Sequence, residues 1–355
     1  MSGGEYRPQY HPAGFDGELR LALEDLRAGR WRETRELLAR TGEDWALRTA
    51  RTQVLAVAAA RTDAVAAWLA EEPSSTDAVV MEARVAVQRA LHAHRARQPD
   101  AERLAARARM VSQDATQFAL EDPVPWICLL SLALVDVGQH LPEHRVPPPE
   151  GLLPTGPWGL LEEVYKRDPY NREAWHRMLQ VFYARKINAF DYVRWVASWA
   201  PLGSPLLVLP LYAYAEDYRS RRASGATTGL ALYWISEQVT HYTSRALDDW
   251  FRHSAPAALP RTSSGGGTPP RFAGGTPTQP SGSGRTPISL RSPIDLNHLG
   301  HALYSGGFDG GTEVFEAIGP HATPAPWQDV ADSPQHWEEE FLRAGRYFLG
   351  GGSPR

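Results

Sequence analysis

The chain has 355 residues, of which 43% are hydrophobic and 22% are charged, as expected of a folded globular protein rather than a disordered one. Its formal net charge of −4 provides no basic footprint for nucleic acid, so we expect no nucleic-acid partner. Cys128 is the single cysteine, which excludes an intramolecular disulfide framework and a thiolate zinc cluster.

Arginine supplies nearly all of the positive charge, because Lys166 and Lys186 are the only lysines. Together with abundant alanine, this bias indicates codon usage in a high-GC bacterial genome. Residues 1–16 lack the apolar stretch of a signal peptide, and the longest apolar runs, 125–137 and 202–215, are too short or interrupted by proline. We therefore expect a cytoplasmic protein without a membrane span.

Helical periodicity recurs along the first 250 residues, while strand-like alternation is almost absent. After a flexible N-terminus (residues 1–15), apolar stripes with helical spacing occur at 19–26, 104–118, 175–182 and 232–250, and the run 126–137 is apolar on all sides. The stripe at 104–118 ends with Phe118. Prolines at positions 73, 123 and 169 each end one helix and begin the next. We expect an all-α domain over residues 16–252.

Composition changes after Arg252, because residues 253–292 are dominated by Gly, Pro, Ser and Thr. Such a segment cannot bury enough apolar surface to offset its ordering entropy, so it is predicted to be a disordered linker. Helical pattern resumes over residues 293–349. These C-terminal helix pairs are predicted to dock on the preceding domain.

Two distant segments share a helix-turn-helix pattern. Gly29-Arg30-Trp31 is followed by Thr34 and Leu38, and Gly306-Gly307-Phe308 is followed by Gly311 and Phe315. Glycine permits the tight turn, and the small residue lets the second helix approach the first. In these positions, and at the Asp168-Pro169-Tyr170-Asn171 junction, the chain resembles tetratricopeptide repeats. The resemblance implies an α-solenoid of paired helices, the architecture also seen in uncharacterised bacterial helical-repeat proteins.

Solenoids of this kind bind peptides along a concave face through exposed aromatic and arginine side chains. The chain carries many aromatic residues between positions 175 and 218, most of them on apolar stripes and therefore expected in the core. The candidates for a partner-binding groove are Tyr183, Trp195, Tyr214 and Arg219. The alternative is that they too belong to the core.

The polar residues form no convincing catalytic or metal-binding set, so no cofactor is predicted. Asp295, His298 and His301 have spacing i, i+3, i+6, which spreads them too far around a helix to hold one ion. His140 and His144 flank Pro142, which breaks a helix between them. Arg172 and His176 resemble the Arg-His pair of small helical ribonucleases, but no substrate pocket is evident beside them. All of these are interpreted as ordinary structural residues.

The linker repeats a Thr-Pro step at Thr268, Thr276 and Thr286, where phosphorylation would add negative charge to an acid-free segment. Random drift within a low-complexity segment explains the same residues.

The sequence as a whole is interpreted as a non-catalytic scaffold or regulator that binds a protein partner, in growth, stress or developmental control. The alternative is an enzyme or small-ligand sensor whose pocket is built from residues distant in sequence.

Overall fold

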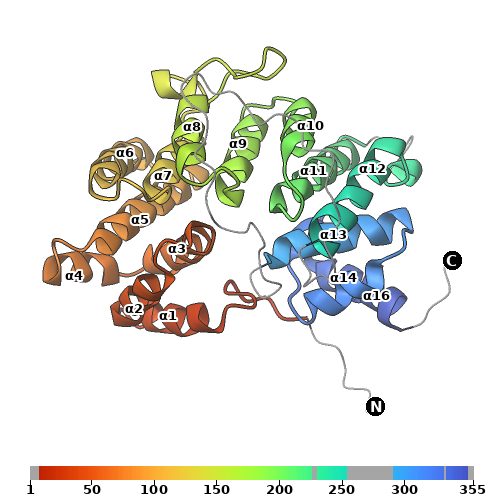
Figure 1. The fold of residues 1–355 in the computed structure, drawn as a ribbon, viewed down its shortest axis with the longest axis horizontal. Helices are drawn as coiled ribbons and strands as arrows, with labels where there is room; N and C mark the ends of the chain where they lie inside the picture. The colour runs from red at the N-terminus through yellow and green to blue at the C-terminus, as the bar shows by residue number, and fades with distance from the viewer. Residues whose placement is uncertain (1–7, 226–229, 254–290, 332, 351–355) are drawn as a thin grey trace. The chain divides into compact units, whose positions relative to one another are not determined.

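The computed structural model describes residues 8–225, 230–253, 291–331 and 333–350 (Figure 1). Within these ranges all regular structure is helical, apart from two isolated bridges, between Gln9 and His321 and between Val146 and Gly156. The predicted all-α fold class is therefore confirmed. No helix in these ranges combines the length and apolarity needed to cross a bilayer.

The contacts between residues divide the chain into two units. The N-terminal unit runs from Asp16 to Tyr192, and the C-terminal unit comprises residues 8–15 together with the described residues from Val193 onward. The boundary lies inside helix α10 (Phe190–Trp199). The predicted domain boundaries at residues 15, 252 and 292 stay predictions.

The N-terminal unit consists of successive helices joined by short turns, with one longer connection, containing the 3₁₀ turn η1 (Pro142–His144), between α7 and α8. Its helices are α1 (Gly17–Arg27), α2 (Arg32–Thr41), α3 (Trp45–Ala59), α4 (Ala64–Glu71), α5 (Thr76–Arg95), α6 (Ala101–Phe118), α7 (Val124–Leu132), α8 (Trp158–Arg167) and α9 (Arg172–Ala184). Each odd-numbered helix packs against the next odd-numbered one, from α1 through α3, α5 and α7 to α9. The even-numbered helices pack beside their sequence neighbours.

Four of the odd-numbered helices begin at a residue whose side chain caps the helix. The side chains of Asp16, Asp44, Ser75 and Asn171 each accept a hydrogen bond from the backbone N–H three residues on. Such caps satisfy backbone donors that have no partner inside the helix, and each contributes about 1 kcal/mol. The starting points of α1, α3, α5 and α9 are thus encoded locally.

A hydrophobic core cluster of this unit lies where α5, α6 and α7 meet. The apolar run predicted as one helix over residues 126–137 forms α7, which ends at Leu132 and is followed by turns. Its side chains are almost all buried, as predicted, and Cys128 is fully enclosed.

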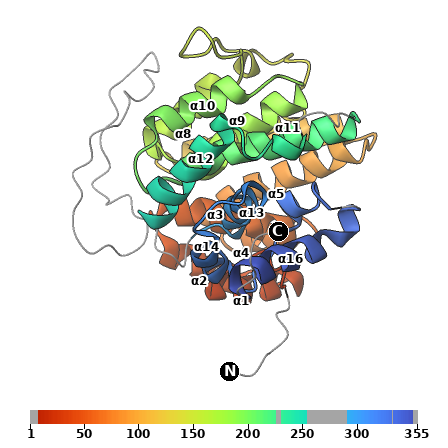
Figure 2. The same cartoon turned by 90° about the vertical axis from the view of Figure 1, so that its right-hand side faces the viewer.

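The C-terminal unit is organised around α13 (Pro293–Gly306), which packs against α11 (Leu209–Ala223), α12 (Glu237–Arg245), α14 (Gly311–Ile318) and α15 (Pro324–Trp327) (Figures 1 and 2). The remaining elements are η2 (Pro205–Val208), η3 (Leu230–Leu232), the π-helical turn η4 (Ala246–Arg252), η6 (Pro334–His336) and α16 (Trp337–Leu349). Residues 8–15 join this unit, since the Gln9 amide donates to the Pro320 carbonyl at 2.6 Å.

Asn297 connects α13 to the segment that follows α14. Its side-chain amide nitrogen donates to the carbonyls of Pro293 and His321, at 2.8 and 2.9 Å. Its side-chain oxygen accepts from the Trp327 indole at 2.8 Å and from the Thr323 amide at 3.4 Å. Because Asn297 is completely buried, these four bonds satisfy a polar group that has no access to water.

The two predicted glycine turns join paired helices, α1 to α2 and α13 to α14. Gly29 and Gly307 have φ values of +77° and +64°, a conformation that glycine adopts without strain. A Cβ atom on Gly311 would lie 2.2 Å from the Phe348 ring. The element that approaches Gly311 closely is therefore α16, whereas the prediction assigned this role to the first helix of the pair, α13.

The stripe predicted over residues 232–250 does not form one continuous helix. Helix α12 begins only at Glu237, and Ile235 is exposed. The residues before it turn back on α11 instead, where the Tyr233 hydroxyl donates to Asp217 at 2.7 Å and the Trp234 ring packs on Tyr218. In the residues before Glu237, the packing of aromatic rings on α11 determines the local structure, although the apolar spacing alone predicts a helix.

Candidate functional site

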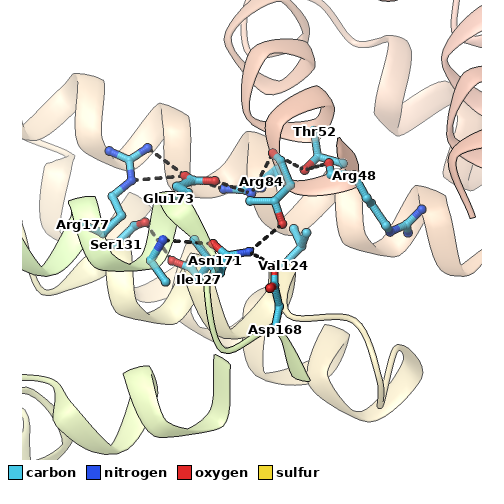
Figure 3. A network of polar contacts seen from close by, with 12 residues as sticks. Arg48, Thr52, Arg84, Val124, Ile127, Ser131, Asp168, Asn171, Glu173 and Arg177 are labelled. Atoms are coloured by element: carbon cyan, nitrogen blue, oxygen red, sulfur yellow. Dashed lines mark hydrogen bonds and ion pairs between the residues drawn. The ribbon is translucent and has the colours of Figure 1, made fainter. Parts of the chain in front are cut away.

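A network of buried ion pairs joins the odd-numbered helices of the N-terminal unit, and Figure 3 shows the part of it around Glu173. Arg48 on α3 donates to Asp122, just before α7, and to Asp77, in the first turn of α5, both at 2.6 Å. The side chains of Arg48 and Asp122 are 5% and 4% exposed. Charged groups this deeply buried persist only when they are paired and hydrogen-bonded. Arg48 therefore fixes the beginnings of two other helices relative to α3.

The second part of the network centres on Glu173, in the first turn of α9. Arg84 on α5 forms a two-pronged ion pair with its carboxylate, at 2.9 and 2.7 Å, and Arg177 donates to the same carboxylate one helical turn further on (Figure 3). Burial alone would raise the pKa of Glu173, but the two guanidinium groups outweigh it and hold the pKa below its ordinary value. Glu173 is therefore ionised at neutral pH.

Asn171 and Asp168 connect the α8–α9 turn to α3. The Asn171 side chain donates to Thr49 at 3.1 Å and to Asp168 at 2.8 Å (Figure 3). Burial raises the pKa of Asp168 to about 6, against the opposing effect of the Asn171 hydrogen bond, and the nearby charge of Asp44 raises it further. The α2–α3 turn and the α8–α9 turn thus lie close enough for their carboxylates to interact.

The same pattern of contacts recurs in this network. An acidic residue near the start of an odd-numbered helix is bound by an arginine from another odd-numbered helix, as also happens when Arg51 donates to Asp16 and Glu18 at the start of α1. Negative charge is favourable at a helix N-terminus, so the acid stabilises its own helix as well as the ion pair. The arrangement positions the helices relative to one another. Burial raises the pKa of Cys128 to about 12, so its nucleophilic thiolate is not formed at neutral pH.

The turns fixed by this network carry exposed apolar side chains. Phe118, Leu120 and Tyr170 are 62%, 60% and 37% exposed. The first two lie at the α6–α7 turn and the third at the α8–α9 turn, and the turns are joined where the Arg167 side chain donates to the Leu120 carbonyl at 2.7 Å. We call Phe118, Leu120 and Tyr170 the turn patch. Large apolar side chains exposed on neighbouring turns mark a candidate site of contact with another macromolecule.

The four residues predicted to line a groove have different surroundings. Tyr183, on α9, belongs to the N-terminal unit and is half-buried, whereas Trp195, Tyr214 and Arg219 belong to the C-terminal unit. Trp195 packs edge-on against Trp199. Tyr214 is 4% exposed, and Arg219 is exposed and paired with Glu216 on its own helix. Their role in binding stays a prediction, and Tyr214 offers little surface for it.

The predicted phosphorylation sites, Thr268, Thr276 and Thr286, lie outside the described residues. Asp295, His298 and His301 are buried in the C-terminal unit. Asp295 accepts a hydrogen bond from Tyr212 at 2.6 Å, and His298 stacks on the same tyrosine ring.

His301 and His144 are both deeply buried. His301 lies between two tryptophan rings, and burial lowers its pKa to about 3. It is therefore neutral at physiological pH. His144 is buried beside Asp136 at 2.9 Å. No group of three metal-ligating side chains converges anywhere in the part of the chain that the structure describes.

The comparisons with known proteins found no match: no protein-family model, no curated protein and no solved structure is similar to this chain.

Sequence reasoning did not find the buried arginines or the turn patch. Arginine abundance was interpreted as codon bias, and Phe118 was assigned to an apolar stripe facing the core. A local signal did exist for Arg48, Arg51 and Arg84. All three lie among apolar or small residues on the inward face of their helices, at positions where a solvated arginine is not expected.

Proposed function

We propose that this protein is a cytoplasmic, non-catalytic scaffold that binds a protein partner, and that its N-terminal unit is a solenoid of paired helices similar to tetratricopeptide repeats. The order of packing supports the solenoid, because each odd-numbered helix contacts the next in a row. Such a row buries its apolar faces only through neighbouring pairs, and it presents its turns along one edge.

The observation that carries the binding role is the turn patch. Phe118 and Leu120 are large apolar side chains that lie mostly in solvent, on a turn that Arg48 anchors to α3 through Asp122. A partner that covers them would gain apolar burial without ordering a flexible segment of the scaffold, which reduces the entropic cost of binding.

The test is crosslinking mass spectrometry of the tagged protein in its native host. A Phe118→Ser/Leu120→Ser variant is compared with the wild type and with a Leu21→Ser control, because Leu21 on α1 is equally exposed at 62%. We expect one stoichiometric partner with the wild type and the control, and a loss of that partner with the double variant. Recovery of no stoichiometric partner by any of the three proteins would contradict a scaffold function.

A further inference from the structure

The turn patch is bordered by exposed acidic side chains. Glu121 directly follows Leu120, and Glu43 and Asp44 lie on the α2–α3 turn, where Asp44 interacts with Asp168 two residues before Tyr170. All three are exposed. Negative charge therefore borders the exposed apolar groups.

The basic side chains at the same turns are already engaged. Arg48 is buried between Asp77 and Asp122. Arg167 pairs with Glu163 at 3.0 Å, and Lys166 pairs with Glu162 and Glu163. Even when Arg172 at the start of α9 is counted, Glu43, Asp44 and Glu121 leave a surplus of negative charge at this edge.

We propose that the turn patch is the docking site for a basic amphipathic segment of the partner protein, with apolar side chains covering Phe118, Leu120 and Tyr170 and with lysines or arginines facing Glu43, Asp44 and Glu121. The inference rests on the proposed function and names the class of partner. Apolar contacts of this kind supply affinity, and complementary charge at the rim supplies specificity and a faster association rate.

The same charges disfavour the other occupants. An anionic membrane surface or a nucleic acid would meet carboxylates of like charge. A second copy of the chain, docked patch to patch, would bring Glu121 and its neighbours against their own equivalents. A basic segment is the occupant for which both the apolar and the charged parts of the surface are complementary.

The probe is a fluorescently labelled peptide of about fourteen residues, built from leucine and lysine with helical spacing, and its control is the same peptide with glutamate in place of lysine. Fluorescence anisotropy is measured with the full chain. We expect the lysine peptide to bind at least about tenfold more tightly than the glutamate peptide, and to lose affinity as salt is raised.

Two double variants test the apolar residues and the acidic residues of the proposed docking site separately. Phe118→Ser/Leu120→Ser is expected to weaken binding of the lysine peptide by at least about tenfold, and Glu43→Gln/Glu121→Gln by about threefold at low salt. The matched control for the apolar residues is Leu21→Ser, at an exposed position on α1. The matched control for the acidic residues is Glu102→Gln, at an exposed position in the first turn of α6. Both controls should leave the affinity for the lysine peptide unchanged. Circular dichroism of each variant verifies folding.

Equal binding of both peptides, or equal loss with the control variants, would overturn the inference. Binding of anionic vesicles that Phe118→Ser/Leu120→Ser abolishes, or a concentration-dependent dimer abolished by the same variant in analytical ultracentrifugation, would overturn it in favour of a membrane or a second copy. A stoichiometric host partner whose crosslinks lie away from the turn patch would also overturn it, and would leave the scaffold function standing. Absence of any host partner would refute the scaffold function itself.

Discussion

Replacing either member of the Arg84–Glu173 pair tests whether the buried network holds the N-terminal unit together. The two replacements are not equivalent in this structure. Without Glu173, the Arg84 guanidinium keeps only the Thr49 carbonyl, at 3.4 Å, as a hydrogen-bond partner. Without Arg84, Glu173 keeps the ion pair with Arg177, whose side chain is 15% exposed and within reach of water.

Breaking a buried ion pair from one side costs about 3–5 kcal/mol, because it leaves an uncompensated charge in the interior. We therefore expect Glu173→Met to lower the free energy of unfolding by about 5 kcal/mol, and Arg84→Met by about 3 kcal/mol, since the remaining charge is still partly compensated. Replacing both residues by methionine removes both charges and keeps apolar volume, so the double variant should lose only about 1 kcal/mol. The corresponding coupling energy is several kcal/mol.

The assay is urea unfolding of the full chain, followed by circular dichroism and by alkylation of Cys128. This thiol is buried in the same unit, so its reaction with iodoacetamide reports the opening of that unit specifically. The reasoning would be refuted if Arg84→Met were as damaging as Glu173→Met, or if the double variant lost the sum of the two single effects.

Three further outcomes are expected. The pKa of Asp168 is raised from 3.8 to about 6 in the folded chain, so the fold favours the protonated form, and the contribution of this group to stability should fall as pH rises from about 4 to 6. Asp168→Asn should remove this contribution and stabilise the chain at pH 8 by about 1 kcal/mol after solvent screening, with the difference between the variant and wild-type thermal melts across pH as the readout. Native Cys128 should resist alkylation at pH 8, where an exposed thiol reacts readily; rapid labelling would contradict its burial. Asn297→Leu should cost at least about 3 kcal/mol in thermal unfolding, because the Trp327 indole and three backbone groups lose their partner, and a cost under about 1 kcal/mol would show that water replaces it.

Local signals were sufficient to predict most of the helices. The stripe Trp175, Met178, Leu179 and Phe182 is entirely buried on α9, as its spacing predicts. The stripe that ends with Phe118 was predicted less well, because this residue is the last of α6 and lies beyond the neighbours that cover the rest of the helix. Periodicity identifies a helix face, but whether another element reaches the end of that face depends on tertiary packing.

The ion-pair network was not predictable in the same way. Arg48 and Asp122 are separated by 74 positions, and Arg84 and Glu173 by 89, so neither pair leaves a local pattern. A sequence shows that an arginine lies on an apolar helix face, but only the packing of α3, α5, α7 and α9 shows which acid it meets. The turn patch is subject to the same limit, since its residues come from two turns joined by Arg167.

The network and the turn patch have a common physical basis. Arginines on α3 and α5 bind acids at the starts of other helices, so part of the positive charge lies inside the N-terminal unit, not on its surface. The acids on the outer side of the same turns, Glu43 and Glu121 among them, are exposed. The interior contacts therefore make the turns rigid and at the same time leave their outer surface negative. A rigid, negatively charged edge with exposed Phe118 and Leu120 loses little conformational entropy when a partner covers it, and it discriminates by charge between a basic segment and an acidic one.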